Sequence, residues 1–292
     1  MKMKKFLLTL AAIAIAAIAA NAEEKTRTYN FGEINGIEAG MNYQIHVTKG
    51  SSDKITVIYD SAYEQYMNIR HAGNVLHMDI KELPRKLRSM NLKPIEVYLE
   101  MDIIRELDLS GAAGAYFSGE FQARDLDIDL SGASKLQGLH INGDTMSIDG
   151  SGASDLSISG NFTSGIEIDL SGAADMEFDG KCMELDCELS GACNLKGNVS
   201  FRTGSIECSG ASKTNLKGSA EKLTIDGSGA CNINTEGIAA DKVHICLSGA
   251  CKARVTASGE LYHDIARSCK MTYFGNAVLH NLNEDSNIVR GR

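Results

Sequence analysis

Apolar and polar residues alternate along most of this chain of 292 residues. From residue 125 onward the alternating segments are short and recur about every 20 residues, as in 125–130, 145–150 and 165–170. An apolar residue at every second position is typical of a β-strand with one buried face. The 3.6-residue period of an amphipathic helix does not occur in these repeats. The pattern therefore predicts an all-β protein built from short strands.

Eight copies of the tripeptide Ser-Gly-Ala follow the alternating segments at steps of 19 to 21 residues. Glycine permits a bend that a residue with a Cβ atom would strain, and small neighbours let successive bends approach closely. A catalytic serine is the alternative, but it needs one activated copy beside a base, and no His recurs near the triplets. We therefore predict a structural role for Ser110, Gly111, Ser131, Gly132, Ser151, Gly152, Ser171, Gly172, Ser190, Gly191, Ser209, Gly210, Ser228, Gly229, Ser248 and Gly249.

The spacing of the strands decides between β architectures. Repeats that stack with their strands in the same sense must pair them in parallel, which usually needs a crossover of a dozen or more residues. Roughly fifteen residues separate consecutive strands, too few for a helix with its loops, and they contain further alternating segments. The sequence predicts a single-stranded parallel β-helix, a solenoid of about eight to nine coils of about 20 residues. Each coil rises by about 4.8 Å, so eight coils make a rod about 40 Å long.

The start of the chain and its charge indicate an exported protein. Residues 1–22 contain three Lys, an apolar run and a small-residue cleavage site at Ala20-Asn21-Ala22, as in a signal peptide. The whole chain has 29 Lys and Arg against 38 Asp and Glu, a net charge of −9; removing residues 1–22 leaves 26 against 38, or −12. Such a surface repels nucleic acids and favours cations or neutral sugars. No second apolar span follows, so we expect a mature protein without a transmembrane segment, in the periplasm or at the cell surface.

The repeat period also divides the chain. Residues outside it still alternate, and a solenoid needs a cap at each end to cover its open core and unpaired strand edge. A basic loop lies at residues 85–94, and Ser268-Cys269-Lys270 lies about one period beyond the last triplet, as a degenerate ninth coil would. The predicted parts are a signal peptide (1–22), an irregular N-terminal β cap (23–105), the Ser-Gly-Ala repeat (106–258) and a C-terminal cap and tail (259–292).

Four features of the sequence together resemble one family of exported bacterial proteins. They are the opening Phe31–Ile37, the strand Tyr43–Val47, the serial Ser-Gly-Ala coils and the closing Met271–Asn276. The family is that of the putative auto-transporter adhesin, head GIN domain. The resemblance covers nearly the whole mature chain and implies a right-handed parallel β-helix, export and an adhesin-like role. It implies no catalytic or binding residues.

An acidic column lies two residues before each triplet Ser, on the solvent face of the predicted strand. Its members are Asp108, Asp129, Asp149, Asp169, Glu188, Glu207 and Asp226, followed by Cys246. Carboxylates about 5 Å apart repel one another by roughly 1 kcal/mol per neighbour in water. The column could deter lateral sheet association, accept hydrogen bonds from backbone amides of the adjacent turn, or bind calcium. The calcium candidates are Asp129, Asp149, Asp169, Glu188 and Glu207.

Eight Cys in an exported protein first suggest disulfides, but most of them occupy repeat columns. Cys193, Cys231 and Cys251 directly follow the triplet, where other coils have Ala or Ser, so that column requires a small side chain. Cys187 and Cys208 replace apolar residues in inward columns. Of these, Cys231 and Cys251 share a column in adjacent coils at a spacing that a disulfide could span, although stacked Cβ vectors suit it poorly. We predict mostly free, buried thiols.

Three classes of function remain open. Enzymes with this fold work in a groove between long loops, whereas coil lengths here vary by only two residues, which predicts no groove walls. Trp is absent, and no cofactor is predicted. The leading hypothesis is a non-catalytic protein of the cell envelope or surface that binds a glycan or a cell-surface protein through a strand face or the N-terminal cap. The alternatives are an assembly module that forms homo-oligomers and, less favoured, a polysaccharide-active enzyme.

Overall fold

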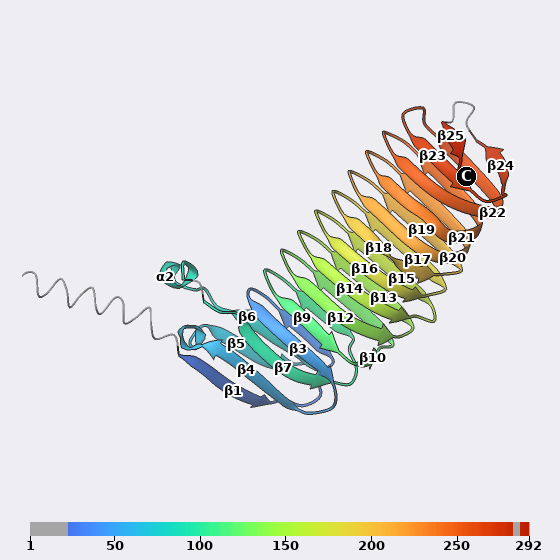
Figure 1. Cartoon of the computed structure of the whole chain (residues 1–292). Coiled ribbons are helices and arrows are strands. Elements are labelled where there is room, and N and C mark those ends of the chain that lie inside the picture. The colour runs from blue at the N-terminus through green and yellow to red at the C-terminus, as the bar shows by residue number, and fades with distance from the viewer. Residues whose placement is uncertain (1–22, 91, 283–286, 292) are drawn as a thin grey trace, which may run out of the picture.

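The computed structural model describes residues 23–90, 92–282 and 287–291. The predicted signal peptide lies outside these residues. Within them the chain is a β-solenoid of about nine turns, which confirms the predicted fold class. Figure 1 shows a straight rod whose coils follow one another from the N-terminal to the C-terminal end. No helix in the described part of the chain is long and apolar enough to cross a membrane.

Each regular coil contributes one strand to each of two parallel stacks. The first stack contains the strands that precede the Ser-Gly-Ala triplets, and the second contains those that follow. The first stack comprises β2 (Gly36–Ala39), β8 (Glu106–Leu109), β11 (Asp125–Leu130), β13 (Thr145–Gly150), β15 (Gly165–Leu170), β17 (Glu184–Leu189), β19 (Thr203–Cys208), the second halves of β20 (Lys213–Gly227), β21 (Asn232–Leu247) and β22 (Lys252–Ile265), and β24 (Val278–Asn281). The second comprises β3 (Tyr43–Lys49), β9 (Gly114–Ser118) with β10 (Glu120–Gln122), β12 (Lys135–Asn142), β14 (Asp155–Asn161), β16 (Asp175–Lys181), β18 (Asn194–Ser200), the first halves of β20 to β22, β23 (Lys270–Phe274) and β25 (Ile288–Arg290).

The Ser-Gly-Ala triplet is the turn that joins the two stacks. Its backbone continues the hydrogen-bond ladder between coils: Ser171 N donates to Gly150 O at 2.8 Å, and Ala173 N donates to Gly152 O at 2.7 Å. The triplet glycine has a positive φ, +75° at Gly172, and a Cβ atom there would lie 2.8 Å from Gly152 O. Both the left-handed backbone and the close approach of the coil beneath therefore select glycine. All eight triplet glycines have a positive φ and a backbone neighbour about this close, and the structural role of the whole triplet stays a prediction.

The N-terminal cap begins with a coil of the same kind. β2 and β3 are joined by the turn Gly40–Asn42, in which Met41 takes the place of the triplet glycine with φ +63°. Beneath this coil lie β6 (Val75–Ile80), parallel to β2, and β7 (Ile95–Met101), parallel to β3. The connection from β6 to β7 is fourteen residues long and contains the short helix α2 (Arg85–Arg88) within the predicted basic loop. The rest of the cap is antiparallel: β5 (Met67–Ala72) on β6, and β4 (Lys54–Asp60) between β7 and β1 (Glu24–Asn30), with the one-turn 3-10 helix η1 (Ser61–Tyr63) after β4.

The core is a set of apolar columns that run along the rod. The position three residues before the triplet Ser is buried in every coil, as at Ile128, Ile148 and Ile168, which stack in register. The position directly after the triplet is buried too and holds only Ala, Ser or Cys. Cys231 is typical: its thiol donates to Ser228 O at 2.9 Å within its own turn.

All eight Cys are free in the structure, Cys231 and Cys251 included, and seven of them are buried. The prediction of free, buried thiols therefore agrees with the structure.

The C-terminal end continues the ladder beyond the last triplet. Lys270 of β23 stacks on Lys252, and the preceding Cys269 is buried, so a degenerate ninth coil is present where it was predicted. One inward position in this region carries a histidine: His263 stacks on Ile245 and is 2% exposed. Its Nδ1 atom has no hydrogen-bond partner among the described residues. Burial lowers the pKa of His263, and the nearby Asp264 opposes this only in part.

Replacing a turn glycine should test the stacking of the coils. Gly172→Ala places a Cβ in a left-handed backbone and against the carbonyl of Gly152, so we expect the free energy of unfolding to fall by about 2 kcal/mol. Chemical denaturation followed by far-UV circular dichroism measures this change. The control is Gly165→Ala, where the nearest atom to a new Cβ is 3.9 Å away. Equal stability of the two variants would contradict the proposed constraint.

The buried histidine should make the C-terminal coils sensitive to acid. Because the folded state lowers the pKa of His263, the unfolded chain binds a proton more readily, and stability is lost as pH falls below the ordinary histidine pKa of about 6.5. We expect His263→Ile, which copies the residue beneath it, to reduce the fall in Tm between pH 7.5 and pH 5.5 by about 2 °C or more. Differential scanning calorimetry at the two pH values measures it. An unchanged pH dependence would contradict the prediction.

Candidate binding groove along the acidic ladder

The acidic column of the sequence forms one continuous ladder on the solvent face of the first stack. Strand pairing places Asp108, Asp129, Asp149, Asp169, Glu188, Glu207 and Asp226 above one another, coil upon coil. The ladder also extends at both ends beyond the repeat: Glu38 pairs with Asp108, and Asp264 follows Asp226 with Cys246 between them. We call these nine carboxylates the acidic ladder. The five calcium candidates form its middle, on adjacent rungs.

A groove with a volume of about 720 Å³ runs beside the ladder. It extends from the coil of Asp149 to the coil of Asp264. In the five coils from Asp149 to Asp226 its lining is the acid, the next residue and the triplet Ser, Cys246 replaces the acid in the next coil, and Asp264 and Ala266 line the last. The prediction that the rod has no groove walls is wrong. The acid and the Ser flank a residue whose side chain points into the core, such as Leu170, which is 2% exposed. The groove is therefore built by alternation at the strand end and needs no long loops.

The lining of the groove is rich in hydrogen-bond acceptors. The backbone amides of the turn donate to carbonyls of the preceding coil, as Ser190 N does to Leu170 O at 2.8 Å. The Ser and Ala amides of the turn are therefore not available to the carboxylates, and a hydrogen bond from the turn to the acidic column stays a prediction for the Gly amide alone. Some Ser hydroxyls also donate to the preceding coil, as Ser151 Oγ does to Leu130 O at 3.3 Å. What remains toward the groove is a row of carboxylates and hydroxyl lone pairs.

Like charges perturb the ladder carboxylates. Burial and the neighbouring acids Asp127, Asp149 and Asp108 raise the pKa of Asp129. Burial, and then Asp149 and Asp186, likewise raise the pKa of Asp169. At Glu188 the charges of Asp169 and Glu207 are the main cause of the raised pKa. At Glu188 the shift reflects repulsion between like charges, which a positive group placed in the groove would reduce.

The ladder differs from the rest of the rod because its charges are not neutralised locally. Within residues 23–90, 92–282 and 287–291, the carboxylates from Asp108 to Asp226 form no ion pair with Lys, Arg or His. On the second stack, by contrast, acids and bases pair across coils. Examples are Lys135 with Asp155 at 3.2 Å and Lys196 with Glu177 at 3.0 Å. The ladder is therefore a line of carboxylates without local neutralisation, although the first stack also contains an ion pair, Lys242 with Glu260 at 3.0 Å.

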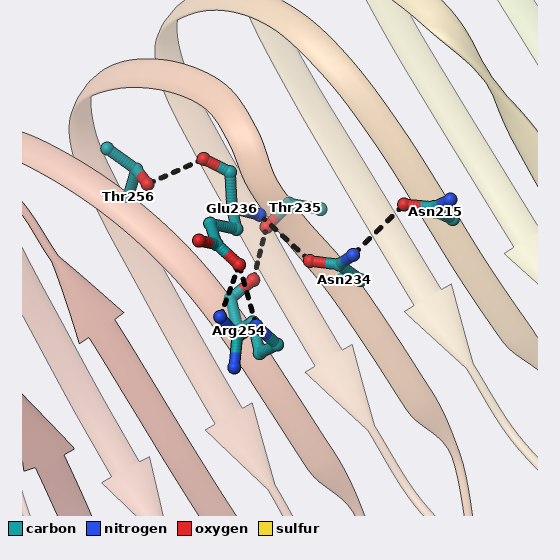
Figure 2. Close-up of polar contacts among 6 residues, drawn as sticks. All are labelled: Asn215, Asn234, Thr235, Glu236, Arg254 and Thr256. Atoms are coloured by element: carbon teal, nitrogen blue, oxygen red, sulfur yellow. Dashed lines mark hydrogen bonds and ion pairs between the residues drawn. The ribbon is translucent and has the colours of Figure 1, made fainter. Parts of the chain in front are cut away.

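A polar cluster near the C-terminal end of the second stack shows the same local pairing (Figure 2). Asn234 donates to Asn215 at 3.0 Å, and the Arg254 guanidinium pairs with Glu236 at 2.5 Å. Thr256 Oγ1 donates to the backbone carbonyl of Glu236 at 2.7 Å. These contacts span the irregularity in the pairing of β21 with its neighbours. Every charge in the cluster has a partner, so the cluster serves the fold and offers no open site.

The structure does not bring metal ligands together. Among the described residues, no group of three or more His, Cys, Asp or Glu side chains is arranged to hold a metal ion. The ladder acids stand one strand spacing apart, which leaves each on its own rung. The calcium hypothesis for Asp129, Asp149, Asp169, Glu188 and Glu207 remains a prediction that depends on the sequence pattern.

The repeat pattern in the sequence did not predict the two ends of the ladder. Glu38 and Asp264 lie outside the Ser-Gly-Ala period, although Glu38-Ala39-Gly40 and Asp264-Ile265-Ala266 keep its order of acid, apolar and small residue. His77 of β6 pairs with Glu38 at 2.5 Å and closes the ladder at the cap.

His46 of β3 is stacked between two tyrosines of other strands. Its ring lies 4.6 Å from that of Tyr98 and 5.4 Å from that of Tyr116, and its Nε2 pairs with Glu96 at 2.7 Å. The spacing of these residues in the sequence has no period, so only the pairing of β3, β7 and β9 could reveal the column.

Comparisons with known proteins agree with this geometry. Residues 33–165 and 163–277 each match the family described as "Putative auto-transporter adhesin, head GIN domain". None of the curated proteins matches the chain. Among solved structures, a "putative adhesin" from Parabacteroides distasonis ATCC 8503 is similar over 92% of this chain and 97% of its own, with 14% identity and a TM-score of 0.51. A "putative adhesin" from Parabacteroides merdae ATCC 43184 is similar over 92% and 94%, with 16% identity and a TM-score of 0.49. At this identity, the P. distasonis likeness shows a shared fold.

Neutralising one rung of the ladder should stabilise the rod. Asp169→Asn removes a carboxylate whose raised pKa shows that its ionisation is disfavoured in the folded state. We expect the Tm at pH 7 and low salt to rise by about 1–2 °C, and the gain to shrink in 0.5 M NaCl because salt screens the repulsion. Differential scanning fluorimetry measures both. The control is Glu177→Gln on the second stack, which loses its partner Lys196 and should not stabilise the protein.

The same melting curves, recorded with millimolar Ca²⁺, test the calcium prediction. A rise in the Tm of the unsubstituted protein that Asp169→Asn diminishes would support it. An unchanged curve would contradict calcium binding by the ladder.

Proposed function

Because the chain belongs to the family of the putative auto-transporter adhesin, head GIN domain, we propose that it is an exported, non-catalytic protein that binds a glycan or a protein at the cell envelope or surface. We propose further that the partner is held in the acidic groove. The observation that carries this proposal is a groove of about 720 Å³ along a carboxylate ladder that has no cationic partner over seven rungs. Repulsion between the neighbouring carboxylates destabilises the folded protein, and a bound cationic group would reduce this repulsion.

The lining of the groove defines the chemistry of the partner. Carboxylates and hydroxyl lone pairs attract groups that donate hydrogen bonds or carry positive charge. Their spacing of about 4.8 Å along the rod suits an extended chain with repeated donors, such as a basic peptide segment or an amino-sugar polymer. Acidic polysaccharides would be repelled.

The contents of the groove also favour binding over catalysis. The Ser hydroxyls are repeated in every coil, and no His is among the residues that line the groove. A nucleophilic Ser needs one such base within hydrogen-bond reach. Cys246, which also faces the groove, is held as a thiol because burial and the carboxylates of Asp226 and Asp264 raise its pKa. The lining therefore supplies acceptors for a ligand and no activated nucleophile.

A binding screen tests the proposal. The mature protein, residues 23–292, is applied to arrays of neutral, acidic and amine-bearing glycans and of basic and acidic peptides. We expect amine-bearing or basic probes to bind, and the double variant Asp169→Asn with Glu188→Gln to lose about tenfold in affinity. Salt should weaken the binding.

The matched control removes the same charge from the other stack. Asp175→Asn with Glu177→Gln changes two exposed acids of β16 and should leave the binding intact. Binding confined to acidic probes, or an equal loss in both double variants, would contradict the role of the groove.

A further inference from the structure

The long connection at the N-terminal end takes the place of a turn. β6 and β7 lie beneath β2 and β3, whose own turn is the three residues Gly40–Asn42. Gly40 N donates to Met78 O, and Ile95 N donates to Asn42 O, so residues 81–94 leave and rejoin the rod at the same edge as the Ser-Gly-Ala turns. Residues 81–94 contain the basic loop predicted at residues 85–94, and below this name is used for all of residues 81–94. In Figure 1 its helix α2 stands clear of the rod.

The basic loop carries positive charge that the cap does not neutralise. Five of its fourteen residues are Lys or Arg and one is Glu, a net charge of +4 in a mature chain of −12. Arg88 pairs with Glu82 of the loop itself, and Lys93 pairs with Glu24 at 3.4 Å, both in exposed positions. Arg85 and Lys86 are exposed and form no ion pair within the described residues.

The complementary surface lies on the same protein, and the loop can extend to its N-terminal end, near Asp149, but not to its middle. The middle of the groove, at Glu188, is six strand spacings from β6, a distance of about 29 Å. Each half of a fourteen-residue loop spans about 24 Å when fully extended, and α2 shortens it further. The loop of one molecule can therefore meet the middle of the groove only on another molecule.

We propose that two copies of this protein associate side by side and in opposite directions, with the basic loop of each seated in the acidic groove of the other. The loop lies at the N-terminal end and the groove in the middle and C-terminal coils, so an antiparallel pair brings each loop against the partner's groove. The contact is then reciprocal and closes as a two-fold dimer. The two acidic ladders repel one another, so the loops are what holds the pair together. This inference concerns the groove of the proposed function and rests on that groove being a binding surface.

Sedimentation velocity and light scattering of residues 23–292 test the proposal. In 50 mM NaCl we expect a concentration-dependent dimer, whose dissociation constant rises about tenfold or more in 300 mM NaCl. The loop variant Arg85→Glu with Lys86→Glu and the groove variant Glu188→Lys with Glu207→Lys should each be monomeric. The control Lys213→Glu with Lys217→Glu, which reverses two exposed charges of β20, should dimerise as the unsubstituted protein does.

Mixing the two monomeric variants gives the sharpest result. The reversed loop of one variant matches the reversed groove of the other, and the two unchanged surfaces match as well, so an equimolar mixture should form a heterodimer. A monomer at all concentrations and salt levels would overturn the inference, as would failure of the mixture to associate while the variants keep their fold by circular dichroism. If the protein is a monomer that binds probes on the array, the proposed function is supported and the dimer is contradicted. If it is a dimer that binds no probe, the dimer is supported and the proposed binding of an external partner is contradicted.

Discussion

Every feature of this protein depends on coils stacked so closely that like residues lie on like. The strictest point is the turn, where seven of the eight triplet glycines lie against the backbone of the glycine beneath them; a Cβ at Gly152 would lie 2.4 Å from Gly132 O. The turn amides donate to the coil below, so the ladder of backbone hydrogen bonds passes through the turn without a break. A turn that cannot vary in size keeps the flanking strands in register over the length of the rod.

Because the coils are stacked in register, a residue type that recurs at one position of each coil forms a continuous line on the surface of the rod. One acid per coil, two residues before the turn, becomes a line of carboxylates with raised pKa values at Asp129, Asp169 and Glu188. The inward residue between the acid and the Ser leaves a hollow, and repetition extends that hollow into a groove. On the second stack the same repetition brings some opposite charges together, as in Lys196 with Glu177. The acidic ladder of the first stack therefore results from the residue type at a single position in each coil.

The ends of the rod show what happens where the repeat stops. At the N-terminal end the small turn is replaced by the fourteen residues of the basic loop, and antiparallel strands β1, β4 and β5 cover the edges of the parallel stacks. Met41 occupies the left-handed turn position there because no triplet turn lies beneath it. At the C-terminal end the inward columns accept His263, whose buried Nδ1 has no hydrogen-bond partner within the part of the chain that the structure describes. At both ends, therefore, residues that depart from the repeat stand in coils that have only one regular neighbour.

The sequence by itself determined the solenoid, the columns and the small residue after each turn, because a period of about 20 residues places identical environments at identical positions. It also determined the acidic column from Asp108 to Asp226. Only the tertiary structure decided that this column lines a groove, since the hollow depends on how the strand meets the turn and not on the length of any loop. The aperiodic residues likewise required the structure: Glu38, His77 and Asp264 join the ladder, and Tyr98, His46 and Tyr116 form a stack, through pairings between strands that no sequence period relates. A repeat can be recognised in a sequence, whereas contacts between segments of unlike sequence are fixed only when their strands pair in the folded chain.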